Sequence, residues 1–117
     1  MRTAEHPLSF CVKDHGTALY VVLEGELDAA TVPTLHDFLR VAINSGVRED
    51  VCLDASCLDY VDSAGLSLLI SMQKRAKANG TGFTIGFPSR QLLEMLQVTG
   101  LEDFFNLANP ASRPVGR

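Results

Sequence analysis

The chain has 117 residues, of which 46% are hydrophobic, and a formal net charge of −4. This length and composition fit one compact domain built around one core. The acidic balance argues against binding to nucleic acid, which requires a concentrated surface of lysine and arginine.

The N-terminal segment and the cysteines indicate the cellular compartment of the protein. Glu5 and His6 stand where a signal peptide would need an unbroken apolar segment, and no run approaches the length of a membrane span. We therefore expect a cytoplasmic protein without membrane contact. The three cysteines, Cys11, Cys52 and Cys57, are an odd number without close paired spacing, which favours free thiols over a disulfide framework or a zinc site. No metal and no cofactor is expected.

The first third of the chain predicts a hairpin followed by a helix. Apolar, β-branched runs at residues 8–12 and 18–23 flank a turn-rich break at residues 13–16, which indicates two strands. After Gly25, apolar residues recur at spacings of three and four and stop near residues 45–46; they are Val32, Leu35, Leu39, Ala42 and Ile43. Either Asp28 or Thr31 can cap this helix, and Pro33 is acceptable only in its first turn.

The middle of the chain predicts a strand, a loop and a second helix. Residues 50–54 form a short apolar run typical of a buried central strand. We interpret the residues after Asp54 as a loop in which Asp54 and Ser56 bind backbone groups. The next helix begins near Asp62 and Ser63 and ends at residues 79–80, with basic residues in its last turns.

The last third predicts one more strand and helix. Residues 83–87 lie between Gly82 and Pro88 and are typical of a strand, whereas Ser89 can cap a helix that Gly100 closes. We expect four apolar residues to pack back on the core: Leu101, Phe104, Phe105 and Leu107. Residues 108–117 contain two prolines and are expected to form a flexible tail.

The alternation of strands and helices defines the fold class. It predicts a single α/β domain over residues 1–107, with a mixed sheet of about four to five strands and helices packed against it.

Three separated blocks of sequence carry a resemblance to a known family. They are Gly25-Glu26-Leu27-Asp28 with Thr31, residues 54–66 with the pattern D-x-S-x-L-x-Y-V-D-S-x-G-L, and Val98-Thr99-Gly100-Leu101. In this order and spacing the blocks resemble the anti-sigma factor antagonists of the STAS domain family, over about residues 8–107.

This resemblance implies a phosphorylation switch. In that family, the serine directly after the aspartate of the D-S-x-G block is phosphorylated by a serine kinase that is also the anti-sigma factor. On this sequence that serine is Ser63. The resemblance further implies that the unphosphorylated chain binds the kinase and releases a sigma factor, that a PP2C-type phosphatase acts on the phosphorylated form, and that the chain is not itself an enzyme. The implied partner-binding residues are Asp28, Asp62, Ser63, Ala64 and Gly65.

The chemistry of a helix start is compatible with this role. A phosphate on Ser63 would lie beside unpaired backbone N–H groups and add about −1.5 to −2 charge, so its main effect would fall on a docking surface. The competing interpretation of Ser63 is an ordinary helix cap. Asp62 can accept the serine hydroxyl or be the cap itself, and Gly65 either permits close approach of a partner or serves helix–sheet packing. Because residue 64 is alanine, Ser63 carries the single hydroxyl of the D-S-x-G segment, residues 62–65.

Two other functions compete with this one. A serine hydrolase would need a glycine two residues before the nucleophile, where this chain has Val61, and a general base among His6, His15 and His36. The second alternative keeps the fold and makes the chain a non-phosphorylated STAS subunit beside a lipid-transport ATPase or in a stress-sensing scaffold, a choice that fold alone does not decide.

Overall fold

The computed structural model describes residues 7–108. In this part of the chain the elements are, in order, β1 (Ser9–His15), β2 (Ala18–Leu27), α1 (Val32–Asn44), β3 (Asp50–Val61), α2 (Ser63–Asn79), β4 (Gly82–Gly86), α3 (Arg90–Thr99) and β5 (Asn106–Ala108). The strands form one sheet in sequential order; β1 is antiparallel to β2, and the other neighbouring pairs are parallel. The predicted α/β architecture with a mixed sheet is confirmed, and the sheet has five strands.

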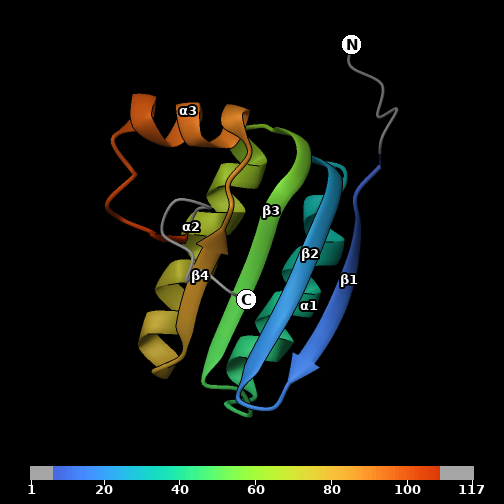
Figure 1. Ribbon diagram of the computed structural model, residues 1–117, viewed down its shortest axis with the longest axis vertical. Helices are drawn as coiled ribbons and strands as arrows, with labels where there is room; N and C mark the ends of the chain where they lie inside the picture. The colour runs from blue at the N-terminus through green and yellow to red at the C-terminus, as the bar shows by residue number, and fades with distance from the viewer. Residues whose placement is uncertain (1–6, 109–117) are drawn as a thin grey trace, which may run out of the picture.

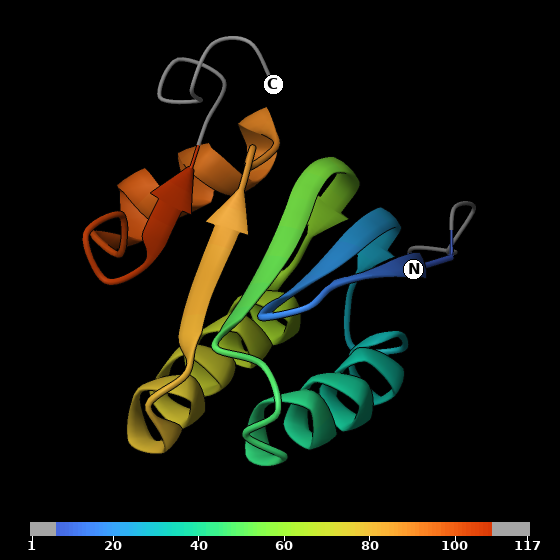
Figure 2. The same ribbon diagram turned by 60° about the horizontal axis from the view of Figure 1, so that its bottom comes forward.

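The helices cover the sheet unequally. α1 and α2 lie side by side against one face, whereas α3 lies across the end of the sheet at which β3 and β4 finish (Figure 1, Figure 2). Alternate residues of β2 point toward the paired helices and are buried, as period-two alternation requires: Leu19, Val21 and Leu23. They meet the buried stripe of α1, formed by Leu35, Leu39 and Ile43. No helix within residues 7–108 combines the length and apolarity needed to cross a membrane.

The hairpin turn is shorter than the sequence suggested. The predicted break at residues 13–16 is wrong in extent, because β1 continues to His15, which pairs with Ala18 across a two-residue turn. Gly16 has φ of 76°. Glycine with a positive φ at the first of the two central positions is typical of the type II′ turn, which fits the twist of the two strands. The polar residues 13–15 remain in the strand because β1 is an edge strand, which tolerates exposed charge.

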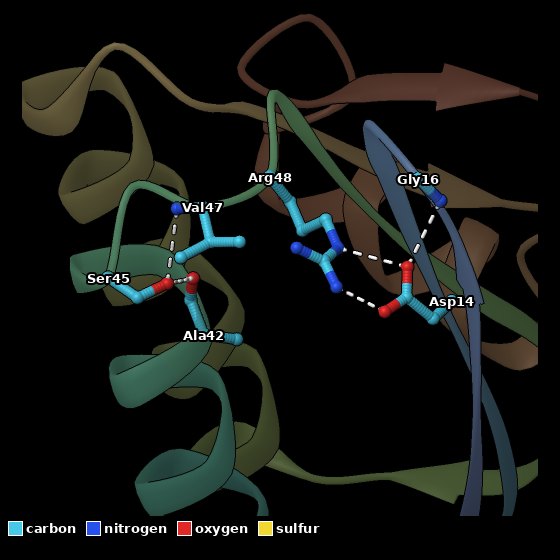
Figure 3. Close-up of polar contacts among 6 residues, drawn as sticks. All are labelled: Asp14, Gly16, Ala42, Ser45, Val47 and Arg48. Carbon is cyan, nitrogen blue, oxygen red and sulfur yellow. Dashed lines mark hydrogen bonds and ion pairs between the residues drawn. The ribbon is translucent and has the colours of Figure 1, made fainter.

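An ion pair ties this hairpin to the loop that follows α1 (Figure 3). Both Nε and a terminal nitrogen of Arg48 donate to the carboxylate of Asp14, and the Nε–Oδ1 distance is 3.1 Å. Asp14 Oδ1 also accepts the Gly16 N–H at 3.0 Å. On the helix side, Ser45 donates to the Ala42 carbonyl at 2.9 Å and terminates α1.

The predicted loop after Asp54 is instead the second half of a long strand. β3 runs to Val61 because β2 offers backbone partners as far as Leu27. Two register shifts place extra residues in β3, so buried side chains no longer alternate and the segment does not resemble a strand. Asp54 does bind backbone as expected: its Oδ1 accepts the Ser56 N–H at 3.0 Å and stabilises the first irregularity.

The C-terminal part contains one strand that the sequence did not predict. β5 pairs in parallel with β4, and at three residues it is too short to leave a periodic signal. Phe105 is buried in the core, but Phe104 is 36% exposed, so the expectation that it packs inward is wrong. Ala108, which we assigned to the tail, is the last residue of β5 and pairs with Gly86. The rest of the predicted tail, residues 109–117, lies outside the described residues.

Candidate functional site

The ends of β2 and β3 bring two distant sequence blocks together. Leu27 and Val61 are partners in the parallel ladder, and the Asp62 N–H donates to the Leu27 carbonyl at 3.2 Å. Asp28 and Asp62 directly follow these two partners. The β2–α1 turn and the start of α2 therefore lie beside each other at the carboxyl end of the sheet, the end at which open α/β sheets place their binding sites.

Asp62 is the N-cap of α2, which decides between the two roles considered for it. Its backbone is extended, and its Oδ1 accepts the Gly65 N–H at 2.9 Å. Ser63 is thus the first helical residue and not the cap. Its side chain is exposed, and its hydroxyl makes no hydrogen bond with any residue in the part of the chain that the structure describes.

Two opposing electrostatic effects act at this helix end. α2 has 17 residues and directs the positive end of its dipole toward Ser63, and its first turn contains no acidic residue. The carboxylate of Asp62 already occupies the Gly65 N–H and places a negative charge one residue from the Ser63 hydroxyl. A phosphate on Ser63 would gain from the helix end and lose against Asp62. Its larger effect would fall on whatever contacts this surface.

Gly65 is the third residue of α2 and is buried. A Cβ at this position would stand 2.6 Å from the Leu27 carbonyl oxygen and 2.9 Å from Cγ1 of Val61. Both distances are shorter than side chains tolerate, so only glycine lets α2 begin this close to the strands. Helix–sheet packing, one of the two interpretations considered, accounts for this glycine, whereas Ala64 beside it is partly exposed.

Asp28 shapes the neighbouring turn. Its Oδ1 accepts the backbone N–H of Ala30 at 3.0 Å and of Thr31 at 3.1 Å. Thr31 occupies the N-cap position of α1 but makes no side-chain cap; its hydroxyl donates to the Glu26 carbonyl at 2.9 Å. The two candidate caps thus order the turn before the helix together, and Ala29 and Ala30 are left exposed at its tip.

Gln91 is a residue of this site that the sequence analysis missed. Its side-chain Oε1 accepts the Val61 N–H at 2.8 Å, and its Nε2 donates to the Val61 carbonyl at 2.9 Å. The amide joins the first turn of α3 to the residue just before Asp62. Beside Leu92 in a helix pattern, this glutamine is indistinguishable from a solvent-facing residue, so no signal in the sequence marks it.

The histidines considered for a hydrolase have other surroundings. His15 ends β1 at the hairpin and pairs with Ala18, which in turn pairs with Asp50 at the start of β3. Ser63 follows the opposite end of β3. The ring of His15 contacts Tyr20, and Nδ1 of His36 lies 3.6 Å from the Asp37 carboxylate. His6 lies outside the described residues. These contacts place neither His15 nor His36 as a base for Ser63.

Comparison with known proteins gives consistent matches over nearly the whole described chain. Residues 11–108 match the family model described as "Mlab, STAS domain". The chain is 27% identical over 97 residues to the anti-sigma-B factor antagonist of Bacillus subtilis, covering 83% of this chain and 87% of that protein. It is 31% identical over 87 residues to the anti-sigma-B factor antagonist of Staphylococcus aureus, covering 74% and 80%.

Solved structures share the fold. An anti-sigma factor antagonist from Mycobacterium paratuberculosis superposes with a TM-score of 0.79 at 23% identity, covering 92% of this chain and 90% of that one. The Bacillus cell fate determinant SpoIIAA in its phosphorylated form superposes with a TM-score of 0.70 at 21% identity, covering 88% and 94%. At these identities the likeness concerns the fold alone.

Proposed function

The chain belongs to the STAS domain family, and from this premise we propose that it is an anti-sigma factor antagonist whose binding is switched by phosphorylation of Ser63. In this proposal the unphosphorylated chain binds a serine-kinase anti-sigma factor in the bacterial cytoplasm and releases a sigma factor. The kinase transfers phosphate from ATP to Ser63, which ends the complex, and a PP2C-type phosphatase restores the binding form. The chain acts as a binding protein and substrate, not as an enzyme.

The observation that carries this proposal is the exposure of Ser63 at a capped and closely packed helix start. Asp62 caps the helix, so the Ser63 hydroxyl is not used for capping. Gly65 sets the helix directly against Leu27 and Val61, which places the backbone of Ser63 relative to the sheet. A hydroxyl that is exposed and has no hydrogen-bond partner among the described residues is accessible to the active site of a kinase.

The surface around Ser63 supports a protein partner. The tip of the β2–α1 turn exposes Ala29 and Ala30, and the start of α2 exposes Ser63 with Ala64 partly exposed beside it. These side chains are small, so a partner can approach the backbone of both loops closely. A phosphate at the centre of such a surface would separate the two proteins and introduce a desolvation cost. In this proposal Asp28 contributes by fixing the shape of the turn, and Gly65 by fixing the helix.

A binding titration tests the proposed interface. We expect Ser63→Glu to weaken binding to the cognate anti-sigma factor by about tenfold or more, because it places a charge within the contact surface. The control is Ser71→Glu, which adds the same charge on an exposed position two turns further along α2. Circular dichroism should show both variants folded. Equal affinity of Ser63→Glu and wild type would contradict the interface, whereas no binding by wild type would favour the alternative of a non-phosphorylated scaffold or transport subunit.

A further inference from the structure

β3, the strand that leads to Ser63, extends further than its neighbour β4. β4 pairs with β3 only from Asp50 to Asp54, whereas β3 continues to Val61. Beyond Asp54, the edge of β3 that faces β4 has no strand beside it within the described residues. Backbone groups on this edge are close to the core and need other hydrogen-bond partners.

The backbone of Val61 faces this uncovered edge. In a parallel ladder a residue binds the two residues that flank its partner, and the Asp62 N–H accordingly donates to Leu27, the partner of Val61. The N–H and carbonyl of Val61 itself therefore point away from β2, toward α3. The side chain of Val61 is fully buried. Water could therefore reach the backbone N–H and carbonyl of Val61 only by entering the fold.

Gln91 supplies what the missing strand would have supplied. Its amide accepts the Val61 N–H at 2.8 Å and donates to the Val61 carbonyl at 2.9 Å. A carboxamide offers the same donor and acceptor as a peptide unit, so the Gln91 side chain pairs with β3 as a strand would. Val61 is two residues before Ser63, and this pairing is the last contact of β3 on that side before the helix begins.

We propose that Gln91 is a positioning residue for the Ser63 switch. It holds the end of β3 from the α3 side while Leu27 holds Asp62 from the β2 side. The two attachments together fix the point at which α2 starts and hence the position of the Ser63 backbone. This inference rests on the proposed function for its consequence, and on the Val61 contacts alone for its mechanism.

Loss of the Gln91 amide should make the start of α2 at Ser63 less well held and leave the packing of the core unchanged. The buried stripe of α3, Leu92 and Leu96, and the Ser89 cap are independent of this side chain. In Gln91→Ala, the Val61 groups lose both partners, and the start of α2 spends less time in the position that a kinase needs. The catalytic rate of phosphorylation then falls more than the affinity for the kinase, because the rest of the docking surface is unchanged.

The experiment compares three variants in the full chain. Gln91→Ala removes both hydrogen bonds; Gln91→Glu keeps the side-chain volume but sets a carboxylate against the Val61 carbonyl. Gln97→Ala is the matched control, since Gln97 is an exposed glutamine of the same helix whose amide reaches Glu102. Amide hydrogen exchange is measured at Val61 and Ser63, with Leu53 in the centre of the sheet as reference. Phosphorylation kinetics are measured with the serine-kinase anti-sigma factor and ATP.

We expect exchange at Val61 to accelerate by about tenfold or more in Gln91→Ala and Gln91→Glu, with Leu53 unchanged and Gln97→Ala like wild type. We expect kcat for Ser63 to fall by about the same factor and KM to change less. Unchanged exchange at Val61, or wild-type behaviour of Gln91→Glu, would overturn the proposal. Faster exchange with unchanged kcat would also overturn it, since Gln91 would then be structural only. If wild type is not phosphorylated at all, the proposed function fails, and the exchange data still decide whether Gln91 fixes the Ser63 turn.

Discussion

Replacing Gly65 with alanine is the sharpest test of how α2 is placed. The new Cβ would lie 2.6 Å from the Leu27 carbonyl oxygen, which is fixed because it accepts the Asp62 N–H. Overpacking of this kind costs about 1 to 3 kcal/mol. Weakening the hydrogen bond from the Asp62 N–H to the Leu27 carbonyl adds about 1 kcal/mol. The higher helix propensity of alanine returns at most about 1 kcal/mol. We therefore expect a net loss of about 1 to 3 kcal/mol in the free energy of unfolding.

Thermal and urea unfolding measure this loss. For a domain of this size, the Tm should fall by about 5 to 20 °C. Ser67→Ala is the control, because it introduces alanine at an exposed position of the same helix and should leave the Tm nearly unchanged. A Gly65→Ala variant as stable as wild type would refute the close contact between α2 and Leu27, and with it the account of how Ser63 is held.

Two further predictions concern side chains that the structure places in defined contacts. Asp62→Ala removes the acceptor of the Gly65 N–H and should cost about 1 kcal/mol of stability in urea unfolding, whereas Asp62→Asn should cost less; equal stability of Asp62→Ala and wild type would contradict the cap. Arg48, and next the Gly16 N–H, lower the pKa of Asp14 from its ordinary value. A carboxyl whose pKa is lowered in the folded state contributes stability above its unfolded pKa and loses it as the pH falls through the folded pKa. Asp14→Asn should thus flatten the decline of stability below about pH 4, and an unchanged decline would show that the ion pair does not contribute.

The sequence predicted best those features whose chemistry is local. Asp62 and Ser63 before a helical pattern, and Asn79-Gly80 after it, mark both ends of α2, because capping involves residues only three or four apart, although the sequence left open which of the first two is the cap. The same holds for Ser89 and Gly100 around α3. The choice of Ser63 as the phosphorylation site followed from a separated set of motifs and stays a prediction, whereas the structure shows that Ser63 is the first residue of α2.

The features that the sequence did not predict depend on distant partners. The second half of β3 is a strand because β2 extends beside it, and its two irregularities erase the alternation by which strands are recognised. Gln91 lies 30 residues from Val61, and its contact exists only because α3 crosses the end of the sheet. The sequence is compatible with Gly65 as a docking feature or a packing feature, and only the position of the Leu27 carbonyl, which belongs to a distant strand, distinguishes the two.

Intact mass after incubation with a serine-kinase anti-sigma factor and ATP tests the central claim most directly. The candidates are the kinases of this type encoded in the same genome as the chain. The account predicts that wild type gains the mass of one phosphate group, that Ser63→Ala gains none, and that Ser67→Ala, one turn further along the exposed face of α2, gains the same as wild type. No gain by wild type with any of these kinases, or a gain that persists in Ser63→Ala, would contradict it.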